Sequence, residues 1–213
     1  MELKGKKINF LGDSITAGSG TSCPDAIYHS VLKRNADLAE SRNYGISGTR
    51  IARQQKITNE VYDYNDFCKR FETMDDDADI VVVFGGTNDF GHGDAPFGTF
   101  EDRTQDTYCG ALHYLMQGLI KKYPTSRIVF MTPIHRLTEN EKDAKGHILK
   151  DYVDVIKKTG EYYSIPVLDL WSLSGIYPII EAQKAAYCPD GLHPNDEGNK
   201  RIAGLLKNFL ESL

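Results

Sequence analysis

Two apolar runs without polar alternation constrain the fold of this chain more than any other feature. Residues 79–84 read DIVVVF and residues 127–132 read RIVFMT. A strand with one face in water alternates apolar and polar residues, whereas a continuous apolar run is typical of a strand covered on both faces, as in a parallel sheet. With three further β-rich segments bounded by turn residues, we expect five strands: Lys7–Leu11, Ser41–Ile46, Asp79–Phe84, Arg127–Thr132 and Ile165–Leu170.

Segments with helical periodicity lie between and after these strands. Ala111–Tyr123, Ile148–Tyr162 and the final stretch from Ile202 to Leu213 each place apolar residues on one helical face. Alternating strands and helices predict an α/β fold, with helices on both faces of a mostly parallel sheet. The 213 residues contain no repeat and no linker, so we expect a single domain over residues 1–213.

Composition excludes several classes of function. The chain is 40% hydrophobic and 26% charged with a net charge of −5, which is ordinary for a soluble globular protein and lacks the basic field of nucleic-acid binders. No apolar run approaches the roughly 20 residues that cross a bilayer, and the start lacks the features of a secretory signal. From the sequence as given we expect a soluble, cytoplasmic protein without a membrane span. The sequence does not indicate an oligomeric state.

Cysteine and histidine spacing gives no sign of a metal or redox centre. The cysteines are scattered without a C-x-x-C pair, and no histidines show an H-x-x-x-H spacing. We therefore expect free thiols, no metal and no cofactor. Cys188 lies two residues before Asp190 and is interpreted as structural.

The residues that follow the strands carry most of the functional information, because ligands of open parallel sheets bind beyond the carboxyl ends of the strands. Gly12-Asp13-Ser14 follows the first expected strand, and Asn88 follows a double glycine after the third. Asp190 and His193 lie in a Pro-Asp-Gly-Leu-His-Pro segment after the fifth. These side chains are expected at one edge of the sheet.

Serine acyl transfer requires a hydroxyl, a base, a group that orients the base, and donors for the oxyanion. Ser14 is the candidate nucleophile, His193 the base and Asp190 its orienting partner. The N–H groups of Ser14 and Gly45 and the amide of Asn88 are the candidate oxyanion donors. Each residue also has a structural explanation when taken alone, since Ser14 could cap a helix and Asp190-Gly191 could form an ordinary turn. Their joint occurrence at the same sheet edge favours catalysis.

Four short blocks carry a resemblance to a known family. GDSIT, NYGISG, GGTND and DGLHP occur in the order and spacing of the SGNH hydrolase superfamily, also called GDSL esterases and lipases, and the likeness covers nearly the whole chain. It implies a flavodoxin-like three-layer α/β/α sandwich with a five-stranded parallel sheet, and no cofactor. By motif, Ser14 matches the nucleophile, Gly45 and Asn88 the oxyanion donors, and Asp190 and His193 the acid–base pair. GDSIT has Ile where the name-giving tetrapeptide has Leu.

The substrate is the least constrained expectation. The segments 89–107 and 134–146 follow strands and are charged and Gly-rich rather than continuously apolar. Within the family this favours small acyl groups, with acetyl on a carbohydrate as one candidate, over long lipid chains. A thioesterase or lysophospholipase on the same triad is an alternative. His92 fits either a substrate contact or a solvated loop position.

A non-enzyme alternative is a flavodoxin-like nucleotide-binding module that uses residues 12–21 as a phosphate loop. That loop lacks both the G-x-G-x-x-G and the Walker lysine patterns. A nucleotide-binding module would also give no functional role to Asn88, Asp190 and His193.

Overall fold

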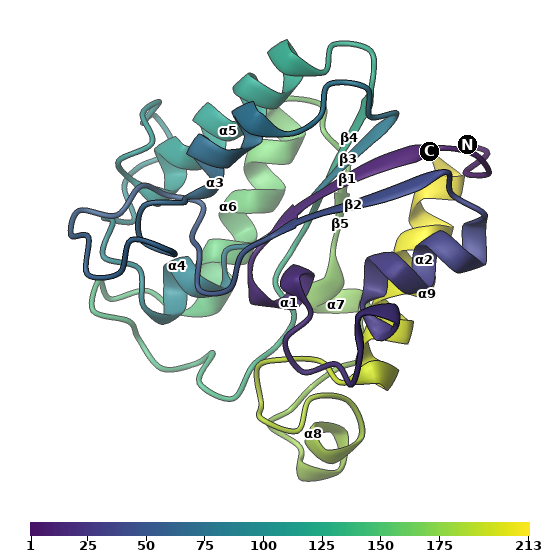
Figure 1. Ribbon diagram of the computed structural model, residues 1–213. Coiled ribbons are helices and arrows are strands. Elements are labelled where there is room, and N and C mark those ends of the chain that lie inside the picture. The colour runs from purple at the N-terminus through teal and green to yellow at the C-terminus, as the bar shows by residue number, and fades with distance from the viewer.

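The computed structural model describes residues 1–213 and is built around one parallel sheet (Figure 1). Its strands lie in the order β2-β1-β3-β4-β5, which is the flavodoxin-like order. All four neighbouring pairs are parallel. The α/β fold class is therefore confirmed. The strands are β1 (Lys7–Gly12), β2 (Glu40–Gly45), β3 (Ile80–Phe84), β4 (Arg127–Met131) and β5 (Val167–Leu168).

Helices cover both faces of the sheet, as the apolar runs predict. In β3, Val81 and Val83 pack into one core, while Val82 and Phe84 pack into the core on the opposite face. Figure 1 shows α3, α5 and α6 on one side of the sheet and α2 and α9 on the other. The helices are α1 (Ser14–Ala17), α2 (Tyr28–Ala36), α3 (Phe67–Arg70), α4 (Thr87–Gly91), α5 (Tyr108–Lys122), α6 (Leu149–Tyr162), α7 (Leu170–Leu173), α8 (Glu181–Tyr187) and α9 (Asp196–Ser212), with short 3-10 turns at Pro24–Ala26 and Phe71–Thr73.

The fifth strand is much shorter than expected, spanning two residues instead of the six from Ile165 to Leu170. Pro166 has no N–H to donate to the sheet, and Asp169 caps α7 by accepting from the N–H of Ser172. Strand pairing therefore begins after the proline and ends before the cap. None of the helices is both long enough and apolar enough to span a membrane.

Strand order determines where a ligand can bind. In this order β1 lies between β2 and β3, and the direction of winding reverses at β1 and β3. The turns after those two strands lead directly into α1 and α4, which begin at Ser14 and Thr87. The switch point is therefore lined by the GDSIT and GGTND blocks.

Candidate active site

The turn after β1 places a capping residue next to the candidate nucleophile. Asp13 caps α1, because its carboxylate accepts the N–H of Ile15 at 3.0 Å. Ser14 is the first residue of the helix, so its N–H has no partner within α1. The cap is thus supplied by Asp13, and the hydroxyl of Ser14 is left for another partner.

That partner is His193, which lies 179 positions away in the sequence. Ser14 Oγ lies 3.0 Å from His193 Nε2, and His193 Nδ1 lies 2.7 Å from Asp190 Oδ2. Because a carboxylate only accepts hydrogen bonds, Nδ1 carries the hydrogen and Nε2 is free to accept from the serine hydroxyl. The three predicted residues therefore meet in the arrangement of a Ser-His-Asp relay.

The turn that carries this pair also holds Asp190 ionised. Its Oδ1 accepts the N–H groups of Leu192 and His193, at 2.9 and 2.7 Å. Partial burial raises the pKa of Asp190, but these bonds and the one from the imidazole outweigh it and leave the pKa below its ordinary value. An ionised carboxylate fixes the imidazole and stabilises an imidazolium.

Close backbone packing joins the two distant segments. Gly20 lies in the left-handed region at φ 90°, and a Cβ there would come within 2.9 Å of the His193 Cβ. Asp196, at the start of α9, accepts from both the N–H and the hydroxyl of Ser22, at 2.8 and 2.6 Å. The loop after α1 is thereby tied to the turn that carries His193.

Asn88 lies in α4, at the same edge of the sheet. Its Nδ2 donates to the carbonyl oxygen of Thr49 at 3.0 Å, and its Oδ1 lies 3.1 Å from His92 Nε2. Since an amide oxygen can only accept, His92 is the donor in that pair. Both contacts orient the amide, and its second N–H remains available to a ligand.

His92 is therefore a contact of Asn88, whereas the sequence suggested a substrate contact or a solvated loop position. The residue as a whole is exposed, but partial desolvation of its ring, together with the charges of Arg50 and Arg136, lowers the pKa of His92 to about 4. The imidazole is neutral at neutral pH and can hold the single tautomer that donates to Asn88. Its spacing of four residues from Asn88 could have indicated this contact, because residues four apart lie close together on a helix.

The assignment of Gly45 as an oxyanion donor needs correction. Its N–H donates to Oδ1 of Asn43 at 2.8 Å, so it is not free for a ligand. A Cβ at Gly45 would lie 2.3 Å from the backbone nitrogen of Ala17, which explains the glycine by close packing of β2 against α1. The N–H of Gly48 has no partner in the chain, and this residue lies in the left-handed region at φ 78°. It directly precedes Thr49, whose carbonyl oxygen binds Asn88.

Cys188 is buried beside this turn. Burial, with the negative charge of Asp190, raises the pKa of its thiol to about 12. A thiol with so high a pKa is a poor nucleophile, which fits a structural role. No group of three or more potential ligands is arranged to hold a metal ion.

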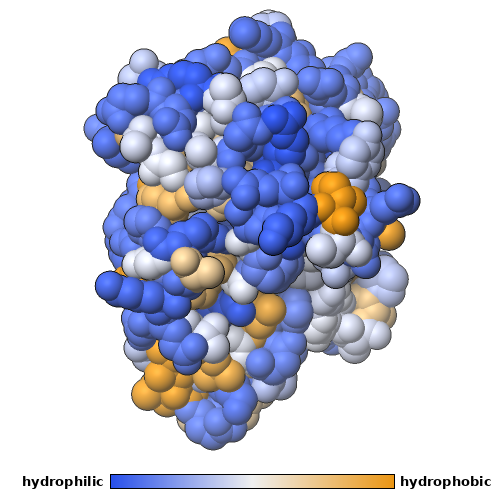
Figure 2. All heavy atoms as spheres, turned by 90° about the vertical axis from the view of Figure 1, so that its left-hand side faces the viewer, coloured by the Kyte–Doolittle hydropathy of each residue, from blue (hydrophilic) through white to orange (hydrophobic).

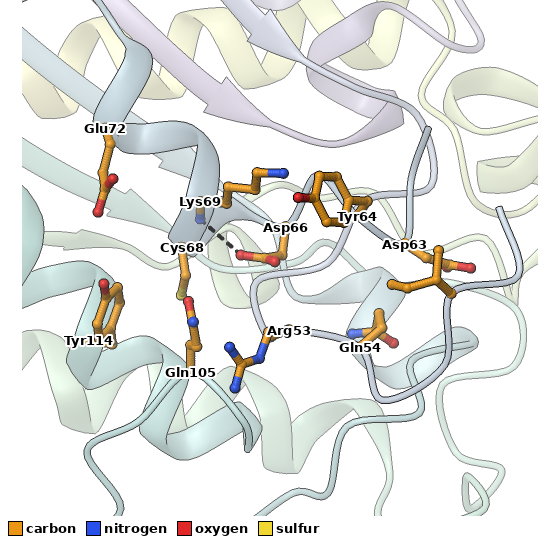
Figure 3. Close-up of a pocket in the computed structure, with 11 residues that line it drawn as sticks. Arg53, Gln54, Asp63, Tyr64, Asp66, Cys68, Lys69, Glu72, Gln105 and Tyr114 are labelled. Atoms are coloured by element: carbon orange, nitrogen blue, oxygen red, sulfur yellow. Dashed lines mark hydrogen bonds between the residues drawn. The ribbon is translucent and has the colours of Figure 1, made fainter. Parts of the chain in front are cut away.

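A separate hollow of about 520 Å³ contains none of the predicted catalytic residues (Figure 3). Several of its polar side chains already have partners. Asp66 accepts the N–H of Lys69 as the cap of α3, and Arg53 pairs with Asp106. Burial raises the pKa of the Cys68 thiol. We assign no function to this hollow.

Comparisons with known proteins show the family of the chain. The sequence profile of the GDSL-like lipase/acylhydrolase family matches residues 10–201. A crystal structure of a protein from Lactobacillus plantarum is 35% identical, with 98% of each chain covered and a TM-score of 0.86. No functionally curated protein matches the chain.

Two more distant structures share the fold. A lipase/acylhydrolase from Enterococcus faecalis is 21% identical, with 97% of this chain and 96% of the other covered and a TM-score of 0.66. An acetyl-xylooligosaccharide esterase from Geobacillus is 20% identical, with 99% and 96% covered and a TM-score of 0.65.

The chain belongs to the GDSL-like lipase/acylhydrolase family, within the SGNH hydrolase superfamily. It is a carboxylic ester hydrolase. This excludes the alternative of a nucleotide-binding module without catalytic activity.

Proposed function

We propose that the protein hydrolyses esters of small acyl groups through an acyl-enzyme on Ser14. The proposal is based on a continuous chain of hydrogen bonds from Ser14 through His193 to Asp190. Ser14 Oγ lies 3.0 Å from His193 Nε2, and His193 Nδ1 lies 2.7 Å from Asp190 Oδ2. His193 takes the proton of Ser14 as the oxygen attacks the ester carbonyl, then gives it to the leaving alcohol. In the second half, His193 activates water, and the acyl group leaves as a carboxylic acid.

The oxyanion is proposed to bind the N–H groups of Ser14 and Gly48 and the free N–H of Asn88. Gly48 replaces Gly45 in this proposal, because the N–H of Gly45 is already bonded to Asn43. An N–H that is free and preorganised stabilises the developing charge without reorganisation during the reaction. The relay and these donors require no cofactor.

Small, polar substrates are proposed on the character of the surface. Figure 2 shows the side of the molecule that lies on the left in Figure 1, which is mainly hydrophilic, with apolar residues in separate patches. The acetyl-xylooligosaccharide esterase from Geobacillus shares the fold, which supports acetylated carbohydrate as one candidate substrate. Thioesters and lysophospholipids are the alternatives, to be tested as competing substrates.

Ser14→Ala tests this function. We expect the variant to keep its circular dichroism spectrum and unfolding midpoint while its kcat on 4-nitrophenyl acetate falls by roughly 10⁴ or more, as for other serine nucleophiles. Ser172→Ala is a control at an exposed serine outside the site. Normal turnover by Ser14→Ala would refute the mechanism.

A chain-length series tests the substrate class. With 4-nitrophenyl esters from acetate to palmitate, we expect kcat/KM to be highest for the shortest acyl groups. A preference for chains of about eight carbons or more would reject the small-acyl proposal, since each buried methylene contributes about 0.8 kcal/mol in an apolar groove. Faster turnover of acetyl-CoA than of oxygen esters would identify a thioesterase.

A further inference from the structure

Arg136 lies between the two halves of the candidate active site. Its Nη1 donates to the carbonyl oxygen of Thr87 at 3.2 Å, directly before Asn88 in α4. The next residue, Leu137, donates its N–H to the carbonyl oxygen of Gly191 at 3.0 Å, inside the turn that carries Asp190 and His193. The backbone and the side chain of this segment therefore connect the oxyanion helix to the acid–base turn.

Most of the guanidinium of Arg136 has no partner in the protein. Nη1 contacts only Thr87, and neither Nε nor Nη2 donates to any protein acceptor. Neither Nε nor Nη2 is among the buried polar atoms that lack a hydrogen-bond partner, so both atoms are accessible to solvent. No carboxylate lies within 4.0 Å of the guanidinium nitrogens, although Glu139 accepts the backbone N–H of Arg136 at 2.9 Å and the carboxylates of Asp13 and Asp190 are in the vicinity. Asp13 caps α1 and Asp190 binds His193, so neither neutralises Arg136 directly.

The surroundings of Arg136 form a pocket with an excess of unpaired positive charge. This pocket has a volume of about 390 Å³ and lies between the end of α4 and the segment 136–145. Lys145 and Asp143 pair with each other. Lys142 makes no ion pair, and Glu141 is the one unpaired acid among the lining residues. The unpaired groups are then two cations and one anion, in a chain whose net charge is −5.

We propose that this pocket is a subsite for an anionic group of the substrate, so that the preferred esters carry a carboxylate or a phosphate beside the scissile bond. The proposal rests on the esterase function argued above. Arginine presents donors in a planar fork that matches both groups, and Nε and Nη2 form one such edge. The contacts with Thr87 and the Phe90 ring, 5.5 Å from the guanidinium carbon, hold that edge in place.

Matched pairs of acetyl esters test the subsite in the wild-type protein. We compare 4-acetoxybenzoate with its neutral methyl ester, and 4-acetoxyphenyl phosphate with its dimethyl ester. Each kcat/KM is divided by the rate constant for alkaline hydrolysis of the same ester, which removes differences in intrinsic reactivity. We expect at least one anionic ester to be preferred by roughly tenfold or more, as for charge-assisted hydrogen bonds. The ester pair that shows the larger preference indicates whether the subsite favours a carboxylate or a phosphate.

Arg136→Gln then tests the residue. We expect it to lower the ratio of kcat/KM for the preferred anionic ester to kcat/KM for its neutral partner by roughly tenfold or more, mainly through the KM of the anion. Arg136→Lys should keep part of the preference, because it retains the charge but not the fork. Arg103→Gln is the matched control, since Arg103 also lacks a carboxylate partner, binds backbone oxygens and does not line this pocket.

Two results would overturn the subsite while leaving the esterase function intact. One is equal use of anionic and neutral esters by the wild type, and the other is an equal loss on both in Arg136→Gln. If Arg136→Gln does not fold, we measure the preference of the wild type for the anionic ester at low and at high salt. We expect the preference to fall with salt, because salt screens the attraction between an exposed cation and an anion. A preference that persists unchanged at about 1 M salt would contradict the proposal. Hydrolysis of none of the four esters would instead refute the proposed function.

Discussion

Among single residues, Asn88 is proposed as an oxyanion donor, so its substitution is expected to change the rate. One of its hydrogens is bound by Thr49 and the other is free, so the amide is already oriented. We expect Asn88→Ala to lower kcat by roughly 10²–10³ with a small effect on KM, because the lost bond forms mainly in the transition state. Steady-state kinetics on a short-chain ester check this. An unchanged kcat would remove Asn88 from the oxyanion site.

His92 is expected to act through Asn88 as a positioning residue. His92→Ala should lower kcat by less than Asn88→Ala, roughly tenfold, because the amide loses one of two contacts. His92→Gln should restore most of the activity, since it offers a side-chain N–H of similar reach. In the Asn88→Ala background, His92→Ala should have little further effect, and an additive loss in this double-mutant cycle would show that the two act independently.

Residue chemistry in the sequence was sufficient to predict Ser14, Asp190, His193 and Asn88 as candidate site residues. It was insufficient for Gly45, whose N–H is bound by the side chain of Asn43, two residues earlier. That spacing is the Asx-turn pattern, which could have signalled the bond. Arg136 gave no motif signal, because its position depends on how the segment after β4 folds across α4.

At the scale of elements, β2 and α1 pack so closely that Gly45 has no room for a side chain. We expect Gly45→Ala to destabilise the fold by about 1–3 kcal/mol through overpacking, and to displace Ser14 with α1. Denaturant unfolding and kcat are the measurements. Gly204→Ala is the matched control, because a Cβ there meets nothing within 4 Å, and it should be neutral or stabilising. Equal stability of the two variants would contradict the packing argument.

His29 lies in α2 and contacts the carbonyl oxygen of Thr16 in α1. Because its imidazole is buried at this contact, we expect the stability of the protein to depend on pH. Burial lowers the pKa of His29 to about 4, whereas its bond to the carbonyl oxygen of Thr16 opposes that shift. Below the ordinary histidine pKa of about 6.5 the unfolded chain takes up a proton that the folded chain does not, so stability falls as pH falls towards 4. The full effect is on the order of 3 kcal/mol.

Two buried acids change the stability of the protein with pH in the opposite direction. A His29 variant is therefore needed to isolate the contribution of His29. Burial raises the pKa of both Asp13 and Asp89 to about 6. As pH falls from about 6 towards the ordinary carboxyl pKa, the folded chain therefore binds protons before the unfolded chain does, and these two acids make the folded protein more stable. The difference in unfolding free energy between His29→Gln and wild type should therefore grow in favour of the variant between about pH 6.5 and pH 4. A difference that is constant with pH would show that His29 is not held neutral.

At the scale of the whole molecule, the apolar runs of β3 and β4 predicted a sheet covered on both faces, and this is confirmed. The expected length of β5 was wrong, because Pro166 and the cap at Asp169 limit pairing on either side. Pocket positions could not be predicted, since they depend on how loops from different strands pack together. The single domain over residues 1–213 and the cytoplasmic location stay predictions.

Ser14, near the start of the chain, and His193, near its end, are proposed to meet and make one reactive serine. The most direct test is reaction with a fluorophosphonate, followed by intact-mass and peptide analysis. We expect one adduct per chain, on the peptide that contains Ser14, with no adduct in Ser14→Ala and slow labelling in His193→Ala. Labelling at another residue, or labelling of Ser14→Ala at the wild-type rate, would contradict it.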